Sequence, residues 1–241
     1  MTERRERLIR WARTQLTCPD HASIAAELLL EFGAGPVDTA DTLPPVDLLD
    51  PNVASLFDIL DAADLSPMDE RVEPRPFTYS PIAILLHHTA TGGSEDMPTL
   101  GLLKKGMPRL PAPISQLLIG RSGSIAVVSD GYSNHAGGGR KKVLVALQAS
   151  RALVRDDIAH KDDGAKGNRW LIGIEVENNG VGEVYKLECL RSMQRTCAAI
   201  CKAFGWSADK VIGHKEWSSR KVDPRYNLDE QRDEIARLIA K

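Results

Sequence analysis

Short apolar segments alternate with longer amphipathic ones from Tyr79 to the end of the chain. Residues 82–88 are apolar at almost every position, which is typical of a strand buried on both faces of a sheet. Residues 187–204 place apolar side chains three and four positions apart, which predicts an amphipathic helix. Similar patterns predict strands at 116–119, 124–128, 170–177 and 211–213 and a helix at 228–240. This order predicts an α/β fold with a mixed central β-sheet flanked by helices.

The first 72 residues have a different pattern, in which short helical segments are separated by proline and glycine. Apolar residues recur at helical spacing in 5–16 and 22–32. A third segment, 51–63, begins with a proline that follows Asp50, an arrangement common at helix starts. We therefore expect three parts, a small helical unit at 1–72, a linker at 73–78 and the α/β domain at 79–241.

The composition indicates a globular protein that does not cross a membrane. A chain of 241 residues with 42% hydrophobic residues can bury one sizeable core. No apolar run is long enough to span a bilayer, and residues 1–7 lead into an amphipathic stretch rather than the apolar core of a signal peptide. We expect synthesis in the cytoplasm without a signal peptide, and no membrane insertion.

The net charge of −2 is divided unequally along the chain. Residues 1–72 carry 14 acidic and 6 basic side chains, a net charge of −8, and the remainder carries 19 acidic and 25 basic side chains, a net charge of +6. A basic domain attracts anionic polymers over a distance that salt limits. Nucleic acid is one such polymer, but no basic and aromatic cluster or known reading motif supports it, so we expect no nucleic-acid partner.

Three cysteines, Cys189, Cys197 and Cys201, fall within the helix predicted at 187–204. Their spacings of eight and four residues place them on one face of that helix. Neither paired spacing nor cysteine density indicates a metal or disulfide framework. We expect small apolar core residues that stay reduced.

Two distant segments offer the ligands of a metal site. The run 213–224, Gly-His-Lys-Glu-Trp-Ser-Ser-Arg-Lys-Val-Asp-Pro, pairs the imidazole of His214 with the carboxylate of Asp223. His87, near the end of the buried strand, offers a second imidazole. Zinc takes nitrogen and oxygen ligands, and a site with three protein ligands keeps its fourth position for water. These residues therefore predict an open catalytic Zn²⁺ site and indicate a zinc hydrolase.

Five segments, in this order along the chain, resemble the zinc-dependent N-acetylmuramoyl-L-alanine amidases. They are Ile84–Ala90, Leu118–Gly123, Asn134–Gly137, Ile172–Asn178 and Gly213–Pro224. This family includes phage lysozyme-like amidases, bacterial amidases that recycle the cell wall and animal peptidoglycan recognition proteins. The resemblance covers residues 78–240 and implies the fold of these amidases, a Zn²⁺ cofactor and hydrolysis of the amide bond between N-acetylmuramic acid and the L-alanine of the stem peptide.

The resemblance implies that His87, His214 and Asp223 hold the metal. Successive residues of a strand point to opposite faces, so His88 faces away from His87. We expect His88 to pack or hydrogen-bond rather than bind metal. The alternative for Asp223 is a turn residue before Pro224, but its sequence context favours the metal ligand.

Glu175 and Lys221 match the catalytic residues of the family. A carboxylate in an otherwise apolar strand needs a reason to face inward, and the resemblance makes Glu175 the general base and acid. Glu177 lies on the same strand face and is the rival, although we expect it to be solvated at the strand end. Lys221 matches the lysine that faces the scissile carbonyl, where it would stabilise the oxyanion. Its alternative is a solvated surface lysine.

Three further residues, Asn134, His135 and Thr89, are expected to contact the substrate. A structural hydrogen bond is the alternative role for His135. Some phage members of the family use a catalytic tyrosine before the first hairpin strand, and Ser115 occupies that position here. This departure assigns the proton transfer to Glu175 alone.

These observations favour a peptidoglycan hydrolase, and specifically a phage or prophage endolysin, which is a bacteriolytic and antimicrobial enzyme. Such a lysin is made in the host cytoplasm and acts on the cell wall after release. The helical unit at 1–72 supports this interpretation, since recycling enzymes tend to be a single compact domain. An intracellular amidase that recycles muropeptides and a noncatalytic peptidoglycan-binding protein are the alternatives. The expected partner is peptidoglycan or muropeptide, and the protein is expected to be a monomer.

Overall fold

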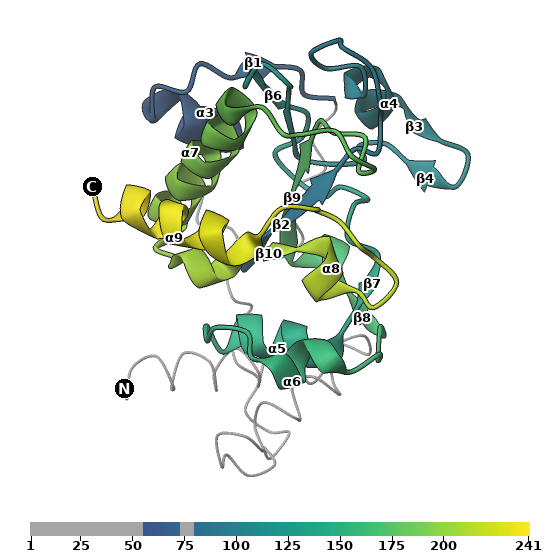
Figure 1. Cartoon of the computed structure of the whole chain (residues 1–241), viewed down its shortest axis with the longest axis vertical. Helices are drawn as coiled ribbons and strands as arrows, with labels where there is room; N and C mark the ends of the chain where they lie inside the picture. Colours follow the sequence, from purple (N-terminus) through teal and green to yellow (C-terminus); the bar gives the residue numbers. More distant parts are fainter. Residues whose placement is uncertain (1–54, 73–79) are drawn as a thin grey trace, which may run out of the picture.

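A mixed six-stranded sheet forms the centre of the computed structural model, which describes residues 55–72 and 80–241 (Figure 1). Its strand order is β1-β6-β5-β9-β2-β10. Strands β5 and β6, which lie within the strands predicted at 116–119 and 124–128, form an antiparallel hairpin, and the other neighbouring strands are parallel. The bounds are β1 Met68–Asp69, β2 Ala83–His88, β5 Leu117–Ile119, β6 Ile125–Val127, β9 Leu171–Val176 and β10 Val211–Gly213. The predicted α/β fold is confirmed.

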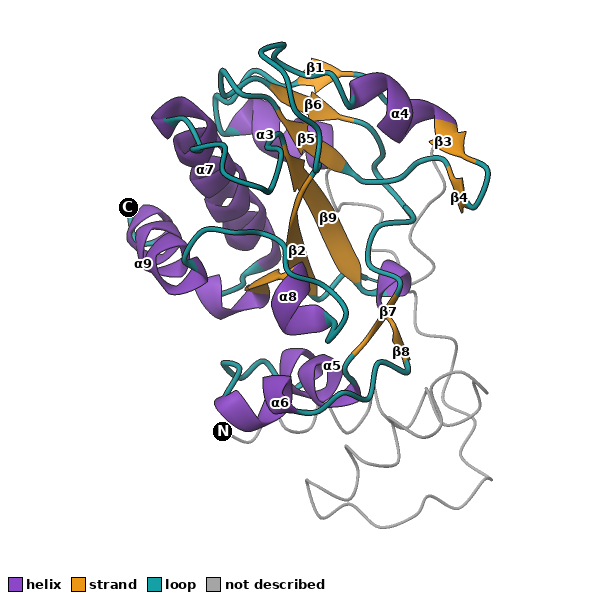
Figure 2. Ribbon diagram, turned by 45° about the vertical axis from the view of Figure 1, so that its right-hand side comes forward, coloured by secondary structure: helices purple, strands orange, loops and turns teal. Residues whose placement is uncertain are grey.

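Helices cover both faces of this sheet (Figure 2). The helices are α3 Leu56–Ala62, α4 Leu100–Lys105, α5 Lys141–Gln148, α6 Arg155–Ala159, α7 Leu187–Phe204, α8 His214–Trp217 and α9 Leu228–Ile239. Side chains of α3, α7 and α9 pack on one face, and those of α5 and α8 pack on the other. Two small hairpins, β3 Gly106–Met107 with β4 Leu110–Pro111 and β7 Gly138–Gly139 with β8 Ala165–Lys166, lie outside the sheet.

The alternation of side chains along β2 divides the core into two parts. Ile84 and Leu86 contribute to the core beneath α7, whereas Ala83 and Leu85 contribute to the core beneath α5. All four side chains are fully buried, which is why the segment is apolar at every position rather than at alternate ones. His87 continues the face of Ala83 and Leu85 and thereby points to the α5 and α8 side of the sheet.

Helix α7 has the bounds predicted from its apolar periodicity. Its three cysteines are buried free thiols on the face that packs against the sheet, as the sequence predicts. The helix ends at Gly205, whose φ of 65° is the left-handed conformation that glycine adopts without steric cost.

Residues 55–72 of the predicted N-terminal unit pack on the sheet domain. Helix α3 begins with a capping box, in which the Ser55 hydroxyl accepts from the Asp58 amide at 3.1 Å and the Asp58 carboxylate accepts from the Ser55 amide at 3.2 Å. Leu60 is fully buried beside α7, and β1 extends the sheet by pairing with β6. The helices expected at 5–16 and 22–32 and the linker at 73–78 lie outside the described residues, so the division into domains stays a prediction.

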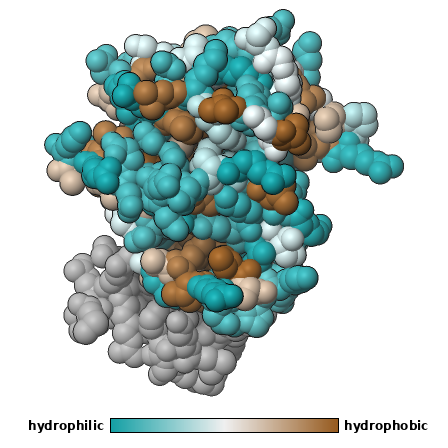
Figure 3. All heavy atoms as spheres, viewed as in Figure 1, coloured by the Kyte–Doolittle hydropathy of each residue, from teal (hydrophilic) through white to brown (hydrophobic). Residues whose placement is uncertain are grey.

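The face shown in Figure 3 is largely hydrophilic, with apolar side chains in separate patches. Two of the most exposed apolar residues, Val181 and Val184, lie in the loop between β9 and α7. In residues 55–72 and 80–241 no helix is both long enough and apolar enough to span a membrane.

Candidate active site

The predicted site residues meet at the carboxyl ends of β2, β9 and β10. In the parallel pairing of β2 with β9, His87 lies opposite Glu175. In the pairing of β2 with β10, Gly213 lies opposite Leu86, so the next residue, His214, lies beside His87. A cavity of about 440 Å³ opens here, and its lining includes His87, Asn134, His135, Glu175, His214, Lys221 and Asp223. Of the predicted site residues, only Thr89 does not line it.

Three donor atoms converge at one end of the cavity. Nδ1 of His87 and Nδ1 of His214 are 2.9 Å apart, and Oδ2 of Asp223 lies 3.4 Å from the first and 3.0 Å from the second. Ligands about 2.0–2.1 Å from a tetrahedral metal ion lie about 3.3 Å from one another. The triangle therefore has the size that one zinc ion requires, and its two nitrogens and one oxygen are donors that zinc accepts.

The protonation states of these residues also suit a cation. Burial and the neighbouring His214 lower the pKa of His87 to about 4, so its imidazole is neutral at pH 7. Burial opposes ionisation of Asp223, but the hydrogen bond with His214 at 3.0 Å and the neighbouring His87 outweigh it and hold the pKa of this carboxyl well below its usual range. A neutral imidazole and an ionised carboxylate are the forms that bind metal.

The short helix α8 fixes His214 through a buried tryptophan. The indole of Trp217 is fully buried and packs on Gly139 and Gly167, where a Cβ at either position would overlap the ring. Its Nε1 donates to the carbonyl oxygen of Ala136 at 3.1 Å. The helix that begins at His214 is thus anchored to the 134–137 loop, which also lines the cavity.

The loop that carries Asp223 folds back onto α8. The Lys215 amide donates to the carbonyl oxygen of Asp223 at 2.7 Å, and the Lys215 ammonium donates to the carbonyl oxygen of Tyr226 at 2.9 Å. These two bonds tie the residue after His214 to the loop on both sides of Pro224. They thereby bring the side chains of His214 and Asp223 together, although nine positions separate them in the sequence.

Glu175 reaches the same cavity from β9. One of its carboxylate oxygens, Oε2, is buried without a hydrogen-bond partner among the residues described. Burial raises the pKa of Glu175 to about 8, and the carboxylates of Asp223 and Glu177 act in the same direction while Lys221 opposes them. A carboxyl group whose pKa lies near neutral pH, and whose Oε2 has no partner among the described residues, is suited to proton transfer.

His135 lies directly behind His87. Its Nδ1 is 3.1 Å from Nε2 of His87, and its Nε2 is 3.0 Å from the carbonyl oxygen of Leu171. Only 8% of the residue is exposed. The alternative role considered for this residue, a structural hydrogen bond, is therefore present. Asn134 lines the cavity wall, where its amide nitrogen donates to the carbonyl oxygen of Pro111 at 2.9 Å.

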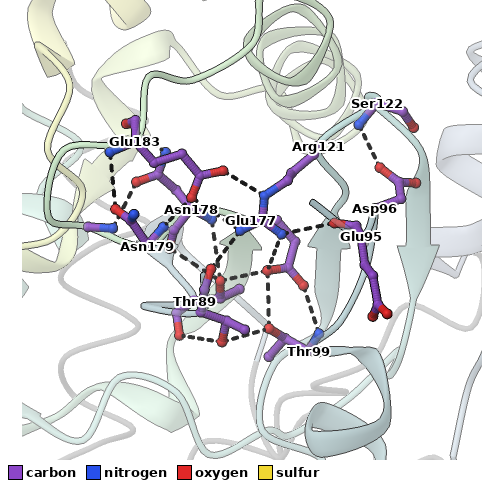
Figure 4. Close-up of polar contacts among 12 residues, drawn as sticks. Thr89, Glu95, Asp96, Thr99, Arg121, Ser122, Glu177, Asn178, Asn179 and Glu183 are labelled. Atoms are coloured by element: carbon purple, nitrogen blue, oxygen red, sulfur yellow. Dashed lines mark hydrogen bonds and ion pairs between the residues drawn. The ribbon is translucent and has the colours of Figure 1, made fainter. Parts of the chain in front are cut away.

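Glu177 is not solvated at the strand end, so that expectation was wrong. Only 1% of it is exposed, because partners from several segments surround it (Figure 4). Its carboxylate accepts from the Thr99 amide at 2.9 Å and hydroxyl at 3.1 Å and from the Thr89 hydroxyl at 2.7 Å, and Arg121 lies 3.7 Å away. The Thr89 hydroxyl thus contacts Glu177, and a substrate contact by this residue stays a prediction.

Arg121 extends this network to the loop that follows β9. Its guanidinium pairs with the Glu183 carboxylate at 2.6 Å and donates to the carbonyl oxygens of Glu95 and Thr91 at 3.0 and 2.6 Å. The side chain is almost fully buried, at 4% exposure. In the sequence Arg121 stands out only as part of the family-like segment Leu118–Gly123, and its role depends on contacts that no local pattern reveals.

Asn168 is a cavity residue that sequence analysis did not identify. Its Oδ1 accepts from the amides of Ala136 at 2.8 Å and Gly137 at 3.1 Å. The side chain thereby orients the 134–137 loop that carries His135. An asparagine between Gly167 and a charged residue is the only local signal, and it is too common in turns to predict this role.

His88 and Ser115 lie outside the metal cluster. The ring of His88 packs against Gly180, and its Nδ1 is buried without a partner among the described residues. The Ser115 hydroxyl is fully buried and donates to the carbonyl oxygen of Gly173 at 2.8 Å. Ser115 therefore contributes no acid or base to the cavity.

The chain matches a known protein family and is similar to solved structures. The sequence model of the family described as N-acetylmuramoyl-L-alanine amidase matches residues 78–226. Two solved structures are similar over 70% of this chain and 95% of their own. One is an endolysin N-acetylmuramoyl-L-alanine amidase, LysCS, from Clostridium intestinale URNW, at 15% identity and a TM-score of 0.48. The other is a selenomethionine derivative of AmpD, at 18% identity and a TM-score of 0.49. No curated protein matches.

Proposed function

The chain belongs to the N-acetylmuramoyl-L-alanine amidase family, and we propose that it is a Zn²⁺-dependent member that separates N-acetylmuramic acid from the L-alanine of peptidoglycan stem peptides. The observation that carries this proposal is the convergence of donor atoms from His87, His214 and Asp223, within 3.4 Å of one another, in the cavity that also contains Glu175.

Zinc would be held by His87, His214 and Asp223. When bound, it would supply Lewis acidity, which lowers the pKa of water from about 15.7 to about 7 and polarises a carbonyl group. With one carboxylate and two neutral imidazoles as ligands, the zinc site would keep a net positive charge. That charge would favour the polarisation of water and of a carbonyl group.

Glu175 would move the proton. Its carboxylate would accept a proton from the attacking water and then donate it to the amine of the departing L-alanine. Burial keeps the group close to the pKa at which both transfers are feasible, and Oε2 is not engaged by another side chain among the residues described.

Lys221 would stabilise the oxyanion. Lys221 is an exposed residue that lines the cavity, two residues before Asp223. Its ammonium would donate a hydrogen bond to the carbonyl oxygen as negative charge develops there. Removal of one such donor typically costs about 3 kcal/mol of transition-state stabilisation. We propose that Asn134, which also lines the cavity, contacts the substrate.

Digestion of purified peptidoglycan tests the activity. The zinc-loaded protein should release new alanine amino termini, whereas new reducing sugar ends would indicate a glycosidase. Glu175→Ala and His214→Ala should abolish the release. A protein that binds peptidoglycan but releases nothing would support the noncatalytic alternative, against which the complete set of His87, His214, Asp223 and Glu175 argues.

For the biological role we propose an endolysin, made in the bacterial cytoplasm and acting on the wall after release. The support is the segment before residue 78, where the family match begins, because a unit added to a catalytic domain suits wall targeting. The rate on intact walls compared with that on small soluble muropeptides tests this role. A strong preference for soluble muropeptides would favour the recycling alternative.

A further inference from the structure

Three groups form a hydrogen-bonded row that ends at the metal cluster. The carbonyl oxygen of Leu171 is 3.0 Å from Nε2 of His135, Nδ1 of His135 is 3.1 Å from Nε2 of His87, and Nδ1 of His87 faces His214 and Asp223. His87 and His135 are 2% and 8% exposed. Their rings are almost perpendicular, at 89°, so a nitrogen of one ring can meet the edge of the other.

The direction of each hydrogen bond follows from the carbonyl group. A carbonyl oxygen can only accept, so Nε2 of His135 carries the proton and donates to Leu171. A neutral imidazole has one N–H, so Nδ1 of His135 is left with a lone pair and accepts from Nε2 of His87. Nδ1 of His87 then also has a lone pair, and this lone pair points into the metal cluster.

We propose that His135 is a positioning residue, which fixes the tautomer and orientation of His87 so that the Nδ1 lone pair of His87 is presented to the cation. The tautomer part stands on the hydrogen bonds alone, and the metal part rests on the proposed function. The opposite tautomer of His87 would set two lone pairs against each other across the 3.1 Å gap between the rings. Partners of this kind typically change metal affinity by about 10–100-fold.

The surroundings hold His135 in place for this role. A Cβ at position 173 would lie 2.5 Å from Cγ of the His135 ring, so only glycine leaves space for the ring over β9. Side chains also fix the backbone of Gly173, because its amide donates to Oε1 of Gln116 at 2.6 Å and its carbonyl oxygen accepts from the Ser115 hydroxyl at 2.8 Å. The backbone at Gly173, on which the His135 ring packs, is therefore held in a defined position.

Nitrogen-15 NMR of the metal-free full-length protein tests the tautomers without any substitution. Long-range couplings between ring nitrogens and carbon-bound protons distinguish Nδ1–H from Nε2–H. We expect Nε2–H in both His87 and His135. Nδ1–H in His87 would overturn the proposal.

Zinc affinity, measured by competition with a chromophoric chelator, tests the consequence. His135→Leu should weaken zinc binding by about 10–100-fold, and His135→Asn, which restores an acceptor close to the position of Nδ1, should recover most of the loss. His160→Ala, in which an exposed histidine outside the cluster is removed, should bind zinc like the wild type. Equal affinities of His135→Leu and the wild type would overturn the proposal. A wild-type protein that binds no zinc would instead refute the proposed function, while the NMR result would still decide the tautomer.

Discussion

The Nδ1 atoms of His87 and His214 lie 2.9 Å apart, although 127 residues separate the two histidines along the chain. Neighbouring parallel strands, β2 and β10, bring them together. Two ring nitrogens and a carboxylate at this separation repel one another unless a proton or a cation lies between them. The stability of the folded protein should therefore depend on what occupies this point.

Zinc should raise the stability of the wild-type protein and do so through these ligands. A ligand that binds only the folded state at 100 times its dissociation constant adds about 2.7 kcal/mol. Thermal unfolding with zinc and with a chelator measures the difference, which should vanish in His214→Ala and Asp223→Ala and persist in His160→Ala. An equal zinc effect in His214→Ala would contradict the assignment of the ligands.

Glu175→Gln should change the pH dependence of stability in the metal-free protein. The pKa of Glu175 is about 8 in the folded protein, raised from 4.5 mainly by burial. The folded state therefore holds a proton that the unfolded state loses, and the wild type loses stability as the pH rises from about 4.5 to 8. Relative to Glu175→Gln this loss is at most about 1.4 kcal/mol per pH unit.

Urea denaturation of the two proteins between pH 4 and 9 measures this difference. The free energy of unfolding of Glu175→Gln, relative to that of the wild type, should rise between about pH 4.5 and 8. Above pH 8 the difference should stay constant. A difference that does not depend on pH would mean that the carboxylate is not held in an unfavourable environment.

Lys221→Met should lower kcat by about 10²–10³-fold, since it removes one oxyanion donor. Zinc affinity should stay the same or increase slightly, because a positive charge near the metal ligands is lost. Lys202→Met, on the exposed side of α7, is the matched control and should leave kcat unchanged. Loss of zinc binding together with activity would assign Lys221 to the metal site instead.

Glu177→Ala should destabilise the fold by about 3–5 kcal/mol, because it leaves the buried Thr99 donors without their acceptor and removes one of the two carboxylates beside the buried Arg121 guanidinium. Chemical denaturation measures the loss. Glu188→Ala removes an exposed carboxylate from α7 and should change stability by less than about 0.5 kcal/mol. A loss below about 1 kcal/mol in Glu177→Ala would show that the network is not a structural brace.

Gly173→Ala should both destabilise the protein and weaken zinc binding, because the new methyl group displaces the His135 ring. Overpacking of this kind costs about 1–3 kcal/mol. Gly101 in α4 has free space around its Cα, so Gly101→Ala should be neutral or stabilising. Unchanged zinc affinity in a folded Gly173→Ala protein would separate the position of His135 from the metal site.

The central elements were predictable because their signals are local. Burial of β2 on both faces makes residues 83–86 uniformly apolar, and burial of one face of α7 gives that helix its periodicity. Strand β1 was not predicted, since Met68 and Asp69 form only two residues of strand and both are exposed. It pairs with β6, a distant segment of the chain, and no pattern within 55–72 expresses that pairing.

The predicted metal ligands and Glu175 meet in one cavity. The resemblance of five segments to the amidase family, together with the residue types in them, made this foreseeable. The buried state of Glu177 was not foreseeable, because Thr89, Thr99 and Arg121 reach it from three other segments. A carboxylate at the end of a strand is read as solvated unless its partners are known. The hydrogen-bonded row from Leu171 through His135 to His87 was not foreseeable either. It depends on how β9, β2 and the 134–137 loop lie relative to one another in space.

The contact of Trp217 with Gly139 and Gly167 has a consequence for the history of such sequences. The indole is in close contact with two residues that lack side chains, so there is no free space between them. A substitution that changes the size of one of the three residues therefore requires a change in a neighbour. Among homologues, a larger residue at 139 should occur only together with a smaller one at 217, and lineages that made this exchange should carry a differently shaped cavity beside an unchanged pair of histidines.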